Sequence, residues 1–251
     1  MAETPPGERL YQRLARHLVG ELSSGRYRVG DRLPPERELS QDYNISRPAV
    51  REAMIALEVQ GIIELRAGSG AYVRRLPGQD DQPSFAITAF ELTEARLLFE
   101  GEAAALAATH ITDEEIAFLD KLIEDMRREN LQPKVTEEAD REFHLAIARA
   151  TRNSGIVATV EQLWRLRSTS PECALLHYKA RNAQVRPVLD EHVAILDALR
   201  ARDPGAARTA MRGHLAAVIE HLLFATEEQA IEAARKAVAS TRARYRSAAH
   251  L

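Results

Sequence analysis

The chain has 251 residues, of which 45% are hydrophobic and 28% are charged, and its formal net charge is −3. This length suffices for one large domain or two smaller ones, and we expect two. The sequence has no signal-peptide pattern near its start and no apolar run of eighteen or more residues, so we expect a cytoplasmic protein without membrane contact. The lone Cys173 excludes an internal disulfide framework and a multi-thiolate zinc site.

The charges are distributed unevenly along the chain. Residues 1–76 contain twelve arginines, no lysine and ten acidic residues, whereas residues 77–251 contain 22 basic and 27 acidic residues. Arginine can contact phosphate and guanine bidentately, which lysine cannot do. The first part is therefore a candidate for nucleic-acid binding if its arginines lie on one surface.

Three helical patterns come first in the chain. Leucines at every fourth position predict a helix over residues 8–25. Residues 33–43 predict a short second helix, with proline and glutamate in its first turn. A third helix is expected from an N-cap at Ser46 to a stop at Gly61. A longer helix followed by two short helices joined by a tight turn is typical of a helix-turn-helix.

The next segment, residues 62–75, alternates apolar and polar side chains around a tip that contains Gly68 and Gly70. This alternation predicts a two-stranded hairpin, which would be the wing of a winged helix. Residues 76–84 are dense in proline, glycine, aspartate and glutamine, and they predict an interdomain linker. The DNA-binding domain is thus expected over residues 1–75.

The second domain, residues 85–251, shows helical patterns and no convincing strand. One helix begins with a capping box formed by Thr112 and Glu115, and another begins at the N-cap Asp203. A weakly apolar last helix is expected near residues 227–244. The sequence therefore predicts a mainly α protein, in which an N-terminal winged helix-turn-helix precedes an all-α bundle of six or seven helices.

Three arginines are candidates for DNA contact. Arg47 and Arg51 are four residues apart at the start of the third predicted helix and share one face. The N-terminal end of a recognition helix points at base edges in the major groove. Ser46, Arg47 and Arg51 are therefore expected to contact bases, and Arg37 to contact the phosphate backbone.

These arginines also have an alternative explanation. They could form a solvated face with intrahelical partners such as Glu36 and Glu52. Gly68 and Gly70 could contact the minor groove or phosphates closely, or they could serve only to build the hairpin. The turn, the wing and the absence of lysine together favour DNA binding.

A second set of candidates is metal-binding. Asp140 and His144 project from one side of their predicted helix, and His192 and His214 are each flanked by apolar residues of other helices. Three helices could present one carboxylate oxygen and three imidazole nitrogens to a common point. Zn²⁺ or Ni²⁺ would accept this set, and Mn²⁺ less comfortably. Spacing alone leaves open that each histidine is an ordinary hydrogen-bonded core residue.

The N-terminal motifs resemble a known family. The segment LPPERELSQDYNISRPAVREAMIALEVQGIIELRAGSGAYV, residues 33–73, resembles the winged helix of GntR-type bacterial transcription regulators in its turn residues, arginine spacing and wing glycines. The helical remainder resembles the FCD domain, the effector-binding domain of the FadR-like branch. Within that branch, residues 140–167, DREFHLAIARATRNSGIVATVEQLWRLR, are most similar to regulators of hexuronate utilisation.

The resemblance implies a metal site. Many FCD-type domains carry an Asp-x-x-x-His pair on one helix and single histidines on two later helices, which together bind a divalent metal. The residues of this chain that match those positions one by one are Asp140, His144, His192 and His214. His177 and His221 are the rival histidines, and we assign both mainly structural or surface roles.

The resemblance also implies an effector site next to the metal, whose open coordination positions would accept the carboxylate or hydroxyl of a small acid. Arg96 matches a recurrent arginine of the first effector-domain helix and could bind the effector carboxylate, or it could simply pair with Glu100 at i+4. Asn153 is expected to be an N-cap, with contact to effector hydroxyls as its alternative role.

Together these features predict a homodimeric regulator, most simply a repressor, that binds double-stranded palindromic operator DNA and responds to a small carboxylate, a hexuronate or related sugar acid. One alternative is a metal-dependent enzyme fused to a DNA-binding domain, and another is an effector-independent DNA-binding protein. The enzyme is disfavoured because the sequence lacks a zinc-protease pattern, a phosphate-binding glycine loop and a nucleophile with a partner base. Asp190 and Glu191, beside His192, are expected to point elsewhere on their helix.

Overall fold

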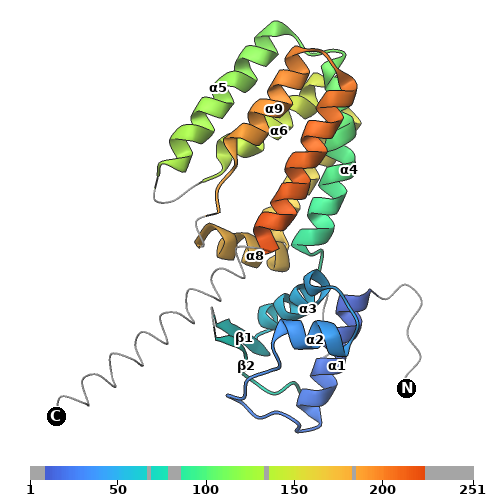
Figure 1. Ribbon diagram of the computed structural model, residues 1–251, viewed down its shortest axis with the longest axis vertical. Helices are drawn as coiled ribbons and strands as arrows, with labels where there is room; N and C mark the ends of the chain where they lie inside the picture. The colour runs from blue at the N-terminus through green and yellow to red at the C-terminus, as the bar shows by residue number, and fades with distance from the viewer. Residues whose placement is uncertain (1–8, 67–68, 79–85, 133–135, 183–184, 224–251) are drawn as a thin grey trace, which may run out of the picture. The chain divides into compact units, whose positions relative to one another are not determined.

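The computed structural model (Figure 1) describes residues 9–66, 69–78, 86–132, 136–182 and 185–223. The chain divides into two compact units, Met1–Ala86 with Leu223–Leu251, and Ile87–Leu222. The predicted helix near residues 227–244 and the wing residue Gly68 lie outside the described residues. The same holds for most of the predicted linker.

The first unit contains three helices and a two-stranded antiparallel sheet. The hairpin register pairs Ile63 with Val73 and Arg66 with Gly70. The apolar faces of the three helices pack together with this hairpin in one core. The elements are α1 (Leu10–Ser23), α2 (Glu36–Asp42), α3 (Arg47–Val59), β1 (Ile63–Arg66) and β2 (Gly70–Val73). This arrangement confirms the predicted winged helix-turn-helix.

Local sequence explains how these elements begin and end. The Ser46 hydroxyl accepts a hydrogen bond from the backbone N–H of Ala49 at 3.4 Å, as expected of an N-cap. Asn44 has a φ of 49°, so the turn between α2 and α3 uses a residue that tolerates the left-handed region. Gly70 has a φ of 102°, and a Cβ atom there would lie 2.9 Å from Nε of Arg32. A glycine is therefore required at this position of the wing.

In the second unit, all regular secondary structure of the described residues is helical. In Figure 1, α4, α5, α6, α9 and the helix of residues 204–223 run lengthwise beside one another, whereas α8 lies across one end. The further bounds are α4 (Ala89–Ala108), α5 (Asp113–Asn130), α6 (Glu138–Ala150), α7 (Ser154–Thr169), α8 (Pro171–Asn182) and α9 (Leu189–Arg200). The mainly α fold is thus confirmed, and the segment that carries His177 is α8.

Capping and packing position these helices. The capping box of Thr112 and Glu115 starts α5, and the Asp203 carboxylate accepts backbone hydrogen bonds at the start of the helix of residues 204–223. In the middle of α4, a Cβ atom on Gly101 would lie 2.7 Å from Cγ of Arg212. The missing side chain of Gly101 lets the helix of residues 204–223 pack closely against α4. These two helices flank the site described next.

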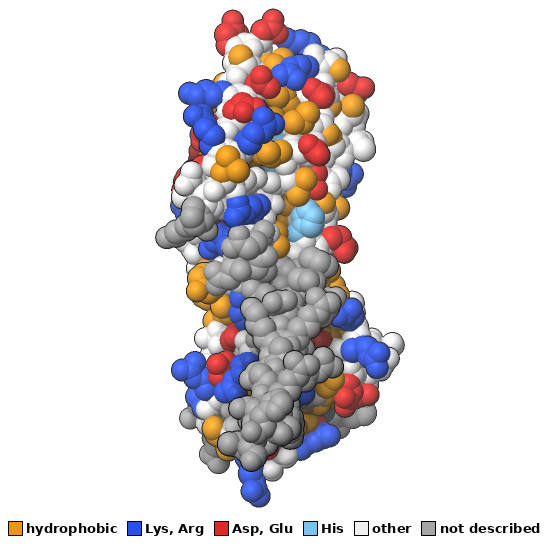
Figure 2. Space-filling view, turned by 60° about the vertical axis from the view of Figure 1, so that its left-hand side comes forward, with side chains coloured by type: hydrophobic (Ala, Val, Ile, Leu, Met, Phe, Trp, Pro, Cys, Tyr) orange, Lys and Arg blue, Asp and Glu red, His pale blue; other side chains and the backbone are white. Residues whose placement is uncertain are grey.

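Among the described residues, no helix is long and apolar enough to cross a bilayer. On the face drawn in Figure 2, basic and acidic side chains are interspersed over the helical unit. Several charged side chains of this unit form ion pairs between helices, such as Arg208 with Glu102 at 2.8 Å.

Candidate metal centre and DNA-binding surface

The four predicted metal ligands come together inside the helical unit. Asp140 and His144 lie one turn apart on α6, His192 comes from α9, and His214 comes from the helix of residues 204–223. All four side chains are buried, and one ligand atom from each lies within 4.8 Å of the others. His192 Nε2 and Asp140 Oδ1 lie 2.9 Å apart. The structure therefore shows a convergence that sequence spacing could not show.

The three imidazole rings are oriented by neighbouring oxygen atoms. His192 Nδ1 lies 2.8 Å from the carbonyl oxygen of Val188, and His214 Nδ1 lies 2.8 Å from Oε2 of Glu191. His144 Nδ1 lies 2.5 Å from Oε2 of Glu100. For His192 and His214, an oxygen acceptor at Nδ1 favours the tautomer with Nδ1 protonated, which leaves Nε2 as the ligand atom, as is usual for histidines that bind metals.

His144 is the least satisfied of the three histidines. Its contact with Glu100 is short but lacks hydrogen-bond geometry, and Nε2 lies 3.6 Å from Oδ1 of Asp140. Both ring nitrogens are buried without a hydrogen-bond partner among the described residues. Because buried polar atoms are normally paired, a cation beside Nε2 would explain this exception. The residues present therefore fit a divalent metal.

The protonation states of the cluster favour metal binding. Burial disfavours ionisation of Asp140, but the adjacent imidazoles of His144 and His192 outweigh it and hold the pKa of Asp140 well below its ordinary value. Burial lowers the pKa of His214 to about 4, so this imidazole is neutral near pH 7. A carboxylate that is ionised and an imidazole that is neutral are the forms that coordinate a metal.

A second buried carboxylate, that of Glu100, contributes to the charge balance of the site. Burial opposes ionisation of Glu100, yet Arg96 and His144 prevail and lower its pKa to about 2. The pKa of His144 is raised by Glu100 and Asp140 against the opposite effect of burial. Without a metal, a proton on His144 would thus partly neutralise the two carboxylates. A divalent cation would replace that proton, since the donor set of one carboxylate oxygen and three nitrogens suits Zn²⁺, Ni²⁺ or Mn²⁺.

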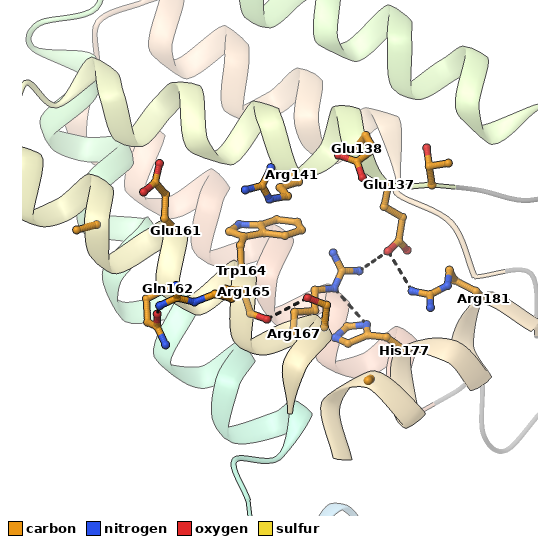
Figure 3. A pocket seen from close by; sticks show the side chains of 14 residues that line it. Glu137, Glu138, Arg141, Glu161, Gln162, Trp164, Arg165, Arg167, His177 and Arg181 are labelled. Atoms are coloured by element: carbon orange, nitrogen blue, oxygen red, sulfur yellow. Dashed lines mark hydrogen bonds and ion pairs between the residues drawn. The ribbon is translucent and has the colours of Figure 1, made fainter. Parts of the chain in front are cut away.

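Two cavities lie near the cluster, and only the smaller one is lined by members of it. The smaller one has a volume of about 50 Å³, and its walls include Asp140 and His214. The larger one has a volume of about 870 Å³ and is lined by the indole of Trp164 and by four arginines (Figure 3), namely Arg141, Arg165, Arg167 and Arg181. The larger volume is within the range of small-molecule sites. The residues that line both cavities are Glu137, Arg167 and His177.

The two candidate effector residues lie in different surroundings. Arg96 is buried, its Nε donates to Oε1 of Glu100 at 2.6 Å, and its guanidinium lies over the Trp164 ring at 4.2 Å. The i+4 pair with Glu100 is thus present, next to the metal ligand His144. Asn153 is exposed, and its side-chain oxygen accepts backbone hydrogen bonds as the N-cap of α7. Asn153 lines neither of the two cavities.

The two rival histidines lie outside the four-ligand cluster. His177 is buried on α8, where Nδ1 lies 3.4 Å from Nε of Arg167. Its pKa is lowered well below the ordinary value by burial and by the nearby arginines, chiefly Arg167. His221 lines the smaller cavity together with His214 and is half-buried.

Several site residues were not predicted as such. Glu191 was expected to point away from the cluster, but its carboxylate contacts Nδ1 of His214 at 2.8 Å. Consecutive residues on a helix point about 100° apart, so Glu191 and His192 cannot face one point, yet His214 reaches Glu191 from the neighbouring helix. Glu100 gave only the signal of an i+4 pair with Arg96. Nothing in the sequence distinguished Arg167 or Trp164 from other residues of α7.

The candidate DNA-binding residues are divided between exposed and buried positions. Ser46 and Arg47, at the start of α3, and Arg37, on α2, are exposed. Arg51 is buried, and its Nη2 lies 2.5 Å from Oε2 of Glu36, so that it joins α3 to α2. For Arg51, the alternative explanation, an ion pair with Glu36, is therefore present in the structure.

Comparison with known proteins identifies the family. Residues 10–73 match "Bacterial regulatory proteins, gntR family", and residues 91–217 match "FCD domain". The chain belongs to the GntR family, in the group with an FCD domain. It is a transcription regulator, and the resemblance of the sequence to this family is confirmed.

The curated relatives of this GntR-family regulator agree with that assignment. The Exu regulon transcriptional regulator of Escherichia coli K12 is 42% identical over 213 residues, which cover 82% of each chain. The Uxu operon transcriptional regulator of the same strain is 36% identical over 232 residues, covering 89% of this chain and 90% of the relative. Among solved structures, Streptococcus agalactiae GntR is 28% identical, with a TM-score of 0.42 over 83% of this chain and 98% of that one. The relatives are named as regulators, not as enzymes.

Proposed function

We propose that this GntR-family protein is a homodimeric repressor that binds palindromic operator DNA. A small carboxylate, a hexuronate or related sugar acid, would release the repressor from the DNA by binding at a divalent metal site. The observation that carries the proposal is the convergence of four buried ligands beside an arginine-lined cavity. The names of the Exu and Uxu relatives favour a hexuronate.

The metal would be held by Asp140, His144, His192 and His214, which fit Zn²⁺, Ni²⁺ or Mn²⁺. A bound ion would supply open coordination positions for a carboxylate or hydroxyl of the effector. Glu100, Val188 and Glu191 would keep the imidazole rings oriented toward it.

The effector would lie between the cluster and the larger cavity. Arg96 remains a candidate partner for its carboxylate, and Asn153 for its hydroxyls. Arg96 already holds Glu100, which in turn contacts His144. If the effector carboxylate replaced that of Glu100 on Arg96, the contact between Glu100 and the metal ligand His144 would therefore be disturbed.

DNA binding is assigned to the start of α3 and to the wing. Ser46 and Arg47 would contact base edges, Arg37 would contact phosphate, and Gly68 and Gly70 would let the wing approach the DNA backbone. Arg51 is also a candidate for base contact, but it would reach the DNA only if its pair with Glu36 opens. Two subunits would place two recognition helices on the two half-sites of a palindrome.

The effector would act by preferring one of two arrangements of the regulator. Its influence on DNA affinity cannot exceed its differential affinity for these arrangements, typically about 1–3 kcal/mol of coupling. The rival functions, a metal-dependent enzyme and an effector-independent DNA-binding protein, differ from the proposal in a simple way. Only a regulator changes its DNA affinity with an acid that it does not consume.

A thermal-shift comparison tests the effector class. The metal-loaded protein is heated with D-galacturonate or D-glucuronate, with the neutral sugars galactose and glucose, and with each acid plus a chelator. Since a ligand that binds only the folded state stabilises it by about 2.7 kcal/mol at a hundred times its Kd, the acids should raise the Tm and the neutral sugars should not. The chelator should abolish the shift. A response only to fatty acyl or amino-acid ligands would contradict the hexuronate assignment.

A further inference from the structure

A small ion-pair cluster separates the two cavities of the helical unit. Glu137 lies directly before α6, Arg167 lies on α7 and Arg181 on α8. Arg167 Nη2 donates to Oε2 of Glu137 at 2.9 Å, and Arg181 Nη1 lies 3.5 Å from the same oxygen (Figure 3). One carboxylate oxygen thus holds two guanidinium groups that face the larger cavity.

Arg167 is the member of this cluster that reaches the metal ligands. Its Nη1 lies 3.6 Å from Oδ2 of Asp140, its Nε faces His177 and its guanidinium lies over the Trp164 ring at 4.8 Å. Only 14% of its side chain is exposed. The guanidinium is therefore oriented on several sides and placed where a ligand of both the metal and the larger cavity would pass.

Glu137 is held in an unusual backbone conformation. Its φ of 60° lies in the left-handed region, which few residues other than glycine and asparagine adopt. Its side chain is only 13% exposed, and the neighbouring Asp140 carboxylate competes for the same arginine. The ion pairs with Arg167 and Arg181 offset this strain and burial. A carboxylate from another molecule could replace that of Glu137 and leave both arginines paired.

We infer that Arg167 and Arg181, in place of Arg96, form the specificity site for the carboxylate of the effector, and that the Glu137 carboxylate occupies this site in the absence of effector. The hydroxyls of the effector would then be the groups that meet the metal. The inference rests on the proposed function and deepens it. Because Glu137 immediately precedes the helix that carries Asp140 and His144, its displacement would act directly on the metal-binding helix. Glu137 is thus a built-in competitor that lowers the apparent affinity for the acid.

Calorimetric titration of D-galacturonate and D-glucuronate into the metal-loaded full-length protein tests the assignment. Glu137→Gln removes the competing charge but keeps the side-chain shape. If the competitor occupies the site about nine-tenths of the time, this variant should bind the acid about tenfold more tightly. Arg167→Gln should weaken binding by about ten- to a hundredfold, because it removes a charge-assisted hydrogen bond.

A matched control for the carboxylate lies in the same cavity. Glu161→Gln removes one carboxylate charge from the cavity lining without touching the cluster of Glu137, Arg167 and Arg181, so it should leave the Kd nearly unchanged. Elemental analysis should show full metal content in Glu137→Gln and Arg167→Gln. Arg181→Gln provides a second arginine variant if Arg167→Gln does not fold.

Three outcomes would overturn the inference. Weaker or unchanged acid binding by Glu137→Gln would show that the ion pairs serve only the fold. Equal effects of Glu137→Gln and Glu161→Gln would show a general charge effect in place of a specific site. If the wild-type protein retains its metal but binds neither acid, the proposed effector class fails and the specificity site fails with it. This failure of the effector class can be told apart from a failure of the specificity site alone, because it appears already in the wild-type protein.

Discussion

At the scale of single residues, the decisive feature is how each ligand of the candidate metal centre is supported. His192 Nδ1 lies beside a backbone carbonyl and His214 Nδ1 beside Glu191, whereas His144 has only a short contact with Glu100 that lacks hydrogen-bond geometry. Only His144 has both ring nitrogens buried without a hydrogen-bond partner in the described part of the chain. His144 is therefore the ligand whose replacement tests the centre most cleanly.

His144→Ala should abolish stoichiometric metal binding, because three remaining ligands and a widened pocket hold a divalent ion far more weakly. Elemental analysis of the purified protein measures this directly. His221→Ala is the matched control, since His221 lines the smaller cavity but lies outside the four-ligand cluster. Full metal content in His144→Ala would show that the ligands are assigned incorrectly.

His177 should make the stability of the protein depend on pH. Burial and the nearby arginines lower its folded-state pKa, so the folded protein keeps this ring neutral while the unfolded chain protonates it below about pH 6.5. The unfolded state then binds more protons, and the free energy of unfolding falls as the pH falls through that range. His177→Gln should make the decline shallower in urea unfolding at pH 7.5, 6.5 and 5.5. An identical slope in both proteins would contradict this role.

At the scale of elements, the sequence predicted the helices whose ends carry strong local signals. Ser46 caps α3, the box of Thr112 and Glu115 starts α5, and Asp203 starts the helix of residues 204–223. These contacts lie within four residues of one another, so a local pattern suffices. The segment of α8 was not assigned, because its apolar residues do not form one clear face.

The first turns of α3 give a prediction that separates DNA contact from stability. Arg47→Ala should cost about 1–3 kcal/mol of operator binding and relax base preference at one position, without lowering the unfolding free energy. Arg51→Ala should instead cost about 1–3 kcal/mol of stability, because it leaves the partly buried Glu36 carboxylate without its partner. Anisotropy with DNA selected from a random pool and urea unfolding provide the two measurements.

The control for this pair is Arg37→Ala on α2. A phosphate contact carries no sequence information, so this change should weaken binding about equally across DNA sequences and reduce its salt dependence. If Arg51→Ala changes base preference while leaving stability intact, the pair with Glu36 must open on DNA, and Arg51 contacts bases directly.

At the scale of the whole molecule, the spacing of residues in the sequence could not show that the four metal ligands come together in the fold. Asp140 and His144 share a helical face by periodicity, but their meeting with His192 and His214 depends on how three helices pack. The resemblance to FCD domains suggested that meeting. Arg167 and Glu137 escaped prediction because their importance arises from contacts across thirty residues, with no local pattern. The family assignment is firm because it rests on motifs spread over the winged helix.

In the proposed mechanism, an acid bound at the metal centre controls DNA binding. Operator affinity of the metal-loaded protein is measured by anisotropy with and without D-galacturonate or D-glucuronate, in the wild type and in His144→Ala, with the acid assayed before and after. We predict that one acid weakens wild-type binding by about 5- to 150-fold, is recovered unchanged, and has no effect on His144→Ala. Equal affinity with and without either acid, or consumption of the acid, would contradict the account.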